Sequence, residues 1–164
     1  MLKKKVTMLG AFAVGKTSLV QRFVHSIFSE KYQTTIGVKI DQKMLTVNDQ
    51  NLTLMLWDLF GQDDFMKIKS SYLLGSSGFI LVADGTRKET IMVAKELYQM
   101  AIQHAGNIPF ILLLNKSDLV DRWEIDDDEL EKLEAIGWKI MRTSAKNGSK
   151  VEEAFYWIAS QMLK

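Results

Sequence analysis

The sequence contains no cysteine, which excludes disulfide bonds, thiolate metal sites, a cysteine nucleophile and lipid groups attached through cysteine. An excess of one charge is also missing, because 21 basic residues are balanced by 20 acidic ones and leave a formal net charge of +1. A chain so nearly neutral has no overall field that would recruit nucleic acid or a membrane surface. We therefore expect no nucleic-acid partner and no direct lipid anchor.

Long hydrophobic runs are missing as well. Residues 1–5 include three lysines, and the apolar run after them is short and is interrupted by Gly10. This pattern fits neither a signal peptide nor a membrane-spanning helix. We expect a cytoplasmic protein, which could reach membranes through a partner.

What the sequence does contain is enough apolar material, 47% of 164 residues, for one substantial core, so we predict a single domain over residues 1–164. Continuous apolar runs at 79–84 and 109–115 are typical of central parallel strands buried on both faces. Residues 38–47 alternate between apolar and polar, which indicates a half-exposed edge strand in an antiparallel hairpin with 52–57. The order of strands and helices predicts an α/β fold of three layers, with a six-stranded, mainly parallel sheet and one antiparallel edge strand.

The remaining elements are predicted from turn composition and helical spacing. Ser149 and Glu152 have the spacing of a capping box that would start the last helix, whose apolar stripe should pack on the sheet. The other predicted elements are a turn at 48–51, a short helix at 65–74, a helix through 94–105, a helix that begins at 126–129, and a strand at 138–141.

The most informative stretch is Gly10-Ala11-Phe12-Ala13-Val14-Gly15-Lys16-Thr17, which matches the phosphate-binding pattern G-x-x-x-x-G-K-[ST] at every fixed position. It follows a short apolar run and precedes a segment that can continue as a helix, so strand, loop and helix come in the required order. An ordinary glycine-containing turn is the alternative, but such a turn does not need a lysine and a hydroxyl at these positions.

Glycines at both ends of this loop let the backbone turn its N–H groups inward and form a concave site for phosphate oxygens. Lys16 can reach the terminal phosphates, and the Thr17 hydroxyl can bind a magnesium ion. The residues that we expect to bind phosphate are Ala13, Val14, Gly15, Lys16, Thr17 and Ser18.

Together with four further motifs, the phosphate loop makes the chain resemble the Ras-like small GTPases, and the motif sequences are most similar to those of the Rab branch. In chain order these motifs are Thr34-Thr35-Ile36-Gly37, Trp57-Asp58-Leu59-Phe60-Gly61-Gln62, Asn115-Lys116-Ser117-Asp118 and Thr143-Ser144-Ala145-Lys146. The resemblance covers almost the whole chain and implies the P-loop NTPase fold of a Ras-like G domain, with GTP or GDP and Mg²⁺ as its ligands.

The resemblance implies roles for the residues around the phosphates. Asp58, at the end of a strand, would orient magnesium-bound water. Thr35 would complete the metal shell only when the third phosphate is present, and the Gly61 amide would contact that phosphate. Gln62 would position the attacking water. The implied catalytic residues are Gln62, Lys16 and Thr35, and the implied metal ligands are Thr17, Thr35 and Asp58.

Recognition of the base would depend on Asp118, because a fixed carboxylate can accept both the ring N–H and the exocyclic amine of guanine, whereas adenine offers no such pair of donors. The resemblance implies that Asn115 joins the base-binding loop to the phosphate loop and that Lys116 lies along the base. The other implied base contacts are Phe28, which packs edge-on, and Ser144, Ala145 and Lys146, with the Ala145 backbone at guanine O6.

Two residues depart from the family pattern. Phe12 occupies a position of the phosphate loop where a small residue is usual, and Phe60 replaces the small residue before the switch glycine. Both side chains could crowd the region used by Gln62 and by an arginine from a partner, which would make GTP hydrolysis slow. The alternative is that the two rings pack together or fold away from the site.

Partner binding is also implied by the resemblance. Ile40, Trp57 and Tyr72 match the apolar patch through which Rab proteins bind effectors, although Trp57 could equally be a packing residue of the sheet. An exchange factor is a second expected partner. The lipidated tail usual in Rab proteins is not seen, so the protein works in solution, reaches membranes through a partner, or is a trimmed form.

The leading hypothesis is a GTP/GDP molecular switch that hydrolyses GTP slowly with magnesium and binds effectors in its GTP state. The alternative is a nucleotide-loaded interaction module that has lost hydrolysis. Phe12 and Phe60 favour the module. The switch is favoured by Gln62, Thr35 and Asp58. An ATP-dependent P-loop kinase is disfavoured by Asp118 and by the lack of an acceptor domain or lid.

Overall fold

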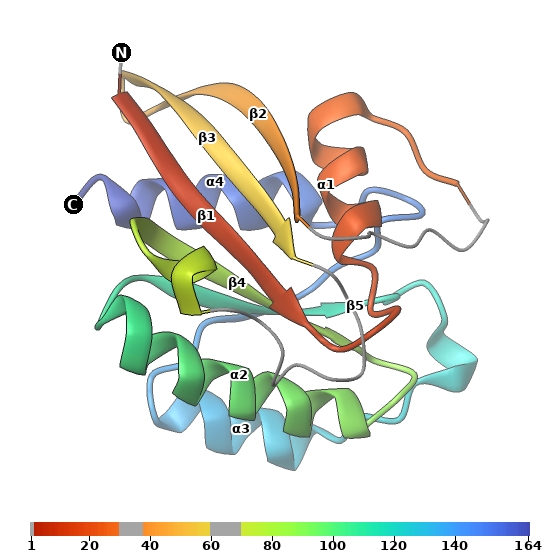
Figure 1. Ribbon diagram of the computed structural model, residues 1–164. Coiled ribbons are helices and arrows are strands. Elements are labelled where there is room, and N and C mark those ends of the chain that lie inside the picture. Colours follow the sequence, from red (N-terminus) through yellow and green to blue (C-terminus); the bar gives the residue numbers. More distant parts are fainter. Residues whose placement is uncertain (1, 30–37, 60–69) are drawn as a thin grey trace.

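A six-stranded sheet with helices on both faces forms the fold (Figure 1). The computed structural model describes residues 2–29, 38–59 and 70–164. The strands are β1 (Leu2–Gly10), β2 (Val38–Val47), β3 (Gln50–Leu59), β4 (Ser76–Asp84), β5 (Phe110–Asn115) and β6 (Ile140–Arg142). The helices are α1 (Lys16–His25), α2 (Glu89–Ala105), α3 (Asp127–Ala135) and α4 (Val151–Met162), with short 3-10 helices at Ser70–Leu73 and Val120–Arg122.

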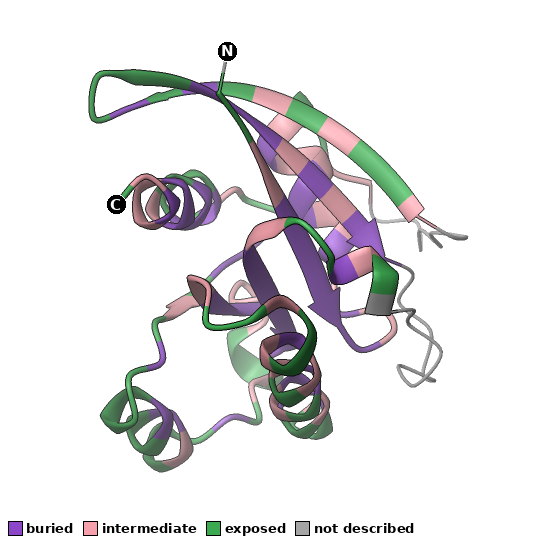
Figure 2. Cartoon of the chain, turned by 60° about the vertical axis from the view of Figure 1, so that its left-hand side comes forward, coloured by how far each residue is buried: buried purple, intermediate pink, exposed green. Residues whose placement is uncertain are grey.

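The strand order is β2-β3-β1-β4-β5-β6, and only the β2–β3 pair is antiparallel. The predicted α/β class, the six-stranded sheet and its antiparallel edge strand are therefore confirmed. β4 and β5 are central strands, and the C-terminal half of β1 lies between β3 and β4, as expected for residues buried on both sides. In Figure 2 the edge strand β2 alternates between exposed and half-buried residues along most of its length.

The β2–β3 hairpin turns more tightly than the sequence predicted. Val47 pairs with Gln50, so the turn consists of Asn48 and Asp49, whose φ angles are 51° and 62°. Asparagine and aspartate tolerate this left-handed conformation better than other side chains, and two such residues match the twist of the flanking strands. As a result β3 begins at Gln50 rather than at residue 52.

Each face of the sheet has its own apolar core. α1 and α4 pack on one face, where the rings of Phe23 and Phe155 stack with centroids 4.2 Å apart. α2 and α3 cover the other face, where Leu97 and Leu133 belong to the core that contains Phe79. The predicted apolar stripe of the last helix is confirmed, since all six of its residues are buried. They are Val151, Ala154, Phe155, Ile158, Ala159 and Met162.

Two local predictions were wrong. α4 is not started by a capping box, because Lys150 takes the cap position with a φ of 62°, and the Ser149 backbone joins a preceding loop through Ser144 and Asn147. The last strand begins at Ile140 instead of residue 138, and Trp138 is buried in the core below α2 and α3.

The predicted helix at 65–74 lies partly outside the described residues. Its described end is a 3-10 helix that stops before Gly75, which has a φ of 76°. None of the described helices is both long enough and apolar enough to cross a membrane.

Candidate functional site

The chemically informative residues lie at the carboxyl ends of the parallel strands. Gly10 ends β1, Asp58 is next to last in β3, Asp84 ends β4 and Asn115 ends β5. The last two are paired in register across the sheet. In open α/β sheets this edge is where ligands bind, so the loops after β1, β4 and β5 begin beside one another at one candidate site, next to Asp58 of β3.

The loop from Gly10 to Lys16 is closed by its own lysine. Lys16 Nζ donates hydrogen bonds to the carbonyl oxygens of Gly10 at 3.0 Å and Ala11 at 3.3 Å. The lysine is buried, and burial lowers the pKa of its ammonium group to about 8, although the nearby Asp58 carboxylate opposes the shift. A buried cation held above a loop of backbone groups is suited to an anionic ligand.

Close approach of two loops requires Gly15. Its φ is +103°, and a Cβ built there would lie 2.2 Å from the Nδ2 atom of Asn115. Gly15 is also the N-cap of α1, so no side chain caps the first turn. The backbone N–H groups at the start of α1, including that of the half-exposed Ser18, can therefore bind a ligand with negative charge.

Thr17 and Asp58 form a pair of oxygen donors below the loop. The Thr17 hydroxyl donates to Asp58 Oδ2 at 2.5 Å, and Asp58 is fully buried. A hydroxyl and a carboxylate suit a hard cation such as Mg²⁺, which binds through one or two protein oxygens together with phosphates and water. Within the described ranges no cluster of three or more acidic, histidine or cysteine residues could hold a metal by itself. The donor set thus fits a metal that arrives with a phosphate ligand.

Asn115 connects the phosphate loop to the loop after β6. Its Nδ2 donates to the Val14 carbonyl at 3.0 Å, and its Oδ1 accepts from the Ala145 backbone N–H at 3.2 Å and from the Thr143 hydroxyl at 3.3 Å. The side chain is buried. One amide therefore sets the spacing between two loops that are about 130 residues apart in the sequence.

The other residues of the base motif lie beside Asn115. Asp118 is half-buried, and its Oδ1 accepts a 2.8 Å hydrogen bond from the Ser144 hydroxyl. Lys116 has a φ of 69°, and its Nζ lies 2.8 Å from Asp84 Oδ2. Of the remaining predicted contacts, Phe28 is half-buried against the α1 and α4 core, and Lys146 is exposed.

The sequence analysis missed Asp84 and Arg87. Asp84 is buried, and its carboxylate accepts hydrogen bonds from the Thr86 backbone N–H at 2.8 Å and from the Thr86 hydroxyl at 2.7 Å. The same carboxylate forms ion pairs with Lys116 and Arg87. Burial by itself would raise the pKa of this carboxyl, but Lys116 and Thr86 outweigh it and lower the pKa. The only available signal was an acidic residue at the end of a buried strand.

Arg22 was missed too, because nothing but its position on α1 marks it. Its Nε donates to the Ala145 carbonyl at 2.7 Å, and Nη2 donates to the Lys146 carbonyl. α1, which carries Lys16 and Thr17 in its first turn, is thereby fastened to the loop after β6.

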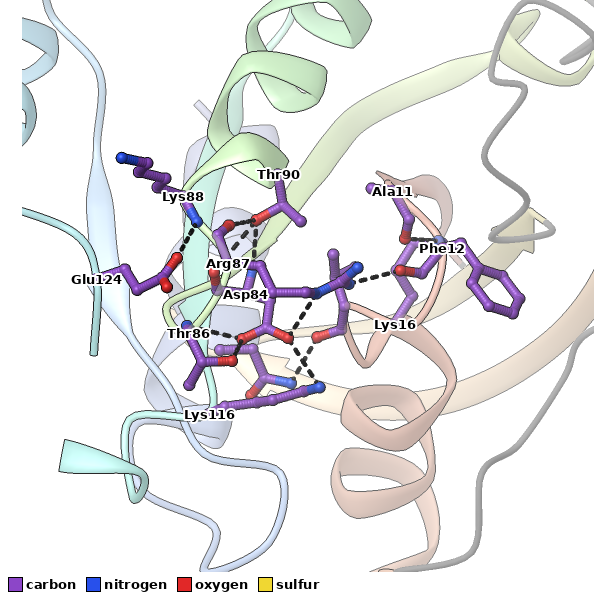
Figure 3. Close-up of polar contacts among 12 residues, drawn as sticks. Ala11, Phe12, Lys16, Asp84, Thr86, Arg87, Lys88, Thr90, Lys116 and Glu124 are labelled. Carbon is purple, nitrogen blue, oxygen red and sulfur yellow. Dashed lines mark hydrogen bonds and ion pairs between the residues drawn. The ribbon is translucent and has the colours of Figure 1, made fainter. Parts of the chain in front are cut away.

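Phe12 is half-buried, and Figure 3 shows its ring directed away from the Asp84 carboxylate, while its carbonyl oxygen accepts a 2.6 Å hydrogen bond from Arg87 Nη2. Four predicted residues, Thr35, Phe60, Gly61 and Gln62, lie outside the described residues. The expected crowding between Phe12, Phe60 and Gln62 therefore stays a prediction.

The expected partner surface is described in part by the strand register. Ile40 is 45% exposed and lies opposite the half-buried Trp57 across the β2–β3 pair. Lys5 Nζ lies 3.7 Å from the centroid of the Trp57 ring and donates to the Leu74 carbonyl at 2.8 Å. Tyr72 is half-buried against the α2 and α3 core. Burial lowers the pKa of Lys5.

The strand order, the loop closed by Lys16 and the oxygen pair at its base define an α/β protein of the phosphate-loop class. The family model described as the Ras family matches residues 5–164. The chain belongs to the Ras family and is a small GTPase, a class of proteins that bind GTP and GDP and act as switches.

Proposed function

We propose that this protein is a guanine-nucleotide switch with slow, magnesium-dependent GTP hydrolysis and GTP-dependent effector binding. The observation that carries the proposal is the Asn115 side chain, which holds the phosphate loop through Val14 and the predicted base loop through Ala145. A site that must read a base and a phosphate chain together needs those two loops at a fixed distance.

The base is assigned to Asp118. The Ser144 hydroxyl donates one hydrogen bond to Asp118 Oδ1 and so orients the carboxylate. The remaining lone pairs of the carboxylate can accept the ring N–H and the amine of guanine. A site built to accept two hydrogen bonds rejects a base that lacks the donors, because its buried acceptors would then lose their partners. Lys116 would lie along the base, and Phe28 would pack edge-on to it.

The phosphates are assigned to the backbone from Ala13 to Ser18 and to Lys16. Thr17, Asp58 and, from outside the described residues, Thr35 would hold Mg²⁺, which supplies neutralising charge between the phosphate groups. Lys16 and the Thr17–Asp58 pair support this assignment, because they place a cation and two oxygen ligands beside the same loop, with Asp58 contributed by β3.

Slow hydrolysis is proposed on the basis of Phe12. Its backbone carbonyl is held by Arg87, which fixes the part of the loop from which the benzyl side chain extends. We infer that Phe12, with Phe60, hinders Gln62 and excludes an arginine supplied by a partner, a group worth about 10³ to 10⁵ in rate where it acts.

Effector binding is assigned to the surface around Ile40, Trp57 and Tyr72, which corresponds to the patch used by Rab proteins. The 45% exposure of Ile40 beside Trp57 supports it. Nucleotide exchange on a slowly hydrolysing protein would also require an exchange factor as a partner.

The experiment is single-turnover hydrolysis of bound GTP with magnesium, for the parent and for Phe12→Gly. We expect the parent to bind GTP and not ATP and to hydrolyse GTP more slowly than about 10⁻⁴ per second, an ordinary intrinsic rate for this class. Phe12→Gly should be faster. Equal rates in both proteins would overturn the role of Phe12, and binding of ATP as tightly as GTP would overturn the base assignment. Retention of GTP by both would favour the hydrolysis-deficient module.

A further inference from the structure

Arg87, in the turn between β4 and α2, connects two parts of the site (Figure 3). Its Nε lies 3.2 Å from Asp84 Oδ2, and its Nη2 donates to the Phe12 carbonyl at 2.6 Å. One guanidinium therefore spans the end of β4 and the middle of the phosphate loop. The side chain is 35% exposed, whereas its Asp84 partner is buried.

The contact with the Phe12 carbonyl determines more than the position of that oxygen. A peptide unit is planar, with its C=O and the following N–H on opposite sides. When Arg87 holds the Phe12 carbonyl on its own side, the N–H of Ala13 is directed to the other side. Ala13 has a φ of 62°, an unusual conformation for alanine that needs support from its surroundings.

Asp84 shares this arrangement with the base motif. The same Oδ2 atom that pairs with Arg87 lies 2.8 Å from Lys116 Nζ. Because both cations pair with the same buried oxygen, the strength of the ion pair between Asp84 and Lys116 depends on whether Arg87 is present.

We propose that Arg87 is a positioning residue for nucleotide retention, which orients the Phe12–Ala13 peptide for phosphate binding and, through Asp84, sets the position of Lys116. The proposal rests on the proposed function, because it assigns Arg87 to the same guanine-nucleotide site. It depends on a guanidinium, because Nε binds the carboxylate while Nη2 binds the carbonyl in one rigid plane, and the flexible lysine side chain with its single nitrogen lacks this fixed fork.

The experiment measures dissociation of fluorescent mant-GDP, with excess GDP and magnesium, from the parent and from the variants Arg87→Ala, Arg87→Lys and Lys88→Ala. Lys88→Ala is the matched control, because it removes the positive charge next to Arg87 in the chain. The Lys88 side chain is exposed and extends away from Asp84 (Figure 3). We expect release about ten-fold faster from Arg87→Ala, the effect of losing hydrogen bonds to a charged group.

Arg87→Lys separates positioning from general structure. A lysine keeps a cation beside Asp84, so the GDP-loaded variant should unfold at nearly the parent temperature and yet release mant-GDP faster than the parent. Lys88→Ala should match the parent in both measurements. If Arg87→Ala fails to fold, Arg87→Lys alone carries the test.

Two results would overturn the proposal while leaving the proposed function standing: Arg87→Ala releasing mant-GDP no faster than Lys88→Ala, or Arg87→Lys retaining it as well as the parent. Failure of the parent itself to retain mant-GDP in preference to mant-ADP would instead refute the proposed function, and this proposal with it.

Discussion

Replacement of Asn115 by alanine should be among the most damaging single changes in this protein. The side chain is 2% exposed and makes three hydrogen bonds, to the Val14 carbonyl, the Ala145 N–H and the Thr143 hydroxyl. Alanine leaves all three groups without that partner in a buried place, and each such loss costs about 1 to 3 kcal/mol. We expect Asn115→Ala to lower the free energy of unfolding by about 3 kcal/mol or more.

Such a loss is a large share of the roughly 5 to 15 kcal/mol by which domains are stable. The assay is urea unfolding followed by circular dichroism, with Asn107→Ala as the control, because Asn107 is exposed and undergoes the same chemical change. The control should stay within about 0.5 kcal/mol of the parent. Should Asn115→Ala unfold as easily as the control and no more, the amide does not hold the two loops together, and the reasoning behind the proposed function is refuted.

Three further predictions concern the loop and the base contact. Gly15→Ala should abolish nucleotide binding, since its Cβ would lie 2.2 Å from Asn115 Nδ2. The control Gly75→Ala has a φ of +76° and open space around its Cβ, so it should suffer only backbone strain and keep binding. Isothermal titration with GDP distinguishes the two variants. The pKa of Lys16 is about 8 in the folded protein against 10.5 in the unfolded chain, so the unfolded chain binds more protons and the nucleotide-free protein should gain stability as the pH rises from about 8 to 10.5; a Lys16→Met variant with the same slope would contradict this. Asp118→Asn should weaken GTP binding at least ten-fold, because the amide presents a donor where guanine also has one, and unchanged affinity would show that the base contact is misassigned.

The sequence was sufficient to place the residues whose position depends on local spacing. Gly15 and Lys16 lie in a loop between a strand and a helix, and Asn115 ends a buried strand, so their places follow from the chain on either side. The predicted start of α4 was wrong, because it depends on a backbone conformation that local spacing does not indicate. Lys150 adopts a positive φ, which few side chains favour, and no pattern in the sequence marks that choice.

Long-range contacts could not be predicted in the same way. The hydrogen bond from Arg87 to the Phe12 carbonyl joins residues 75 positions apart, and it exists only because β1 and β4 are neighbours in the sheet. Arg22 reaches the Ala145 carbonyl across 123 positions. A sequence pattern identifies an arginine on a helix, but it does not say which carbonyl lies within its reach.

The contacts of the phosphate loop share one physical logic. Arg87 holds the Phe12 carbonyl, and Asn115 holds the Val14 carbonyl. Because the C=O and N–H of a peptide unit lie on opposite sides, these bonds direct the N–H groups of Ala13 and Gly15 away from the two side chains, toward the side on which phosphate is expected. The loop is thus ordered through its acceptors so that its donors are left for the ligand. Arg87 and Asn115 reach the two carbonyls from different strand ends, so loss of either one should loosen one peptide and leave the other in place.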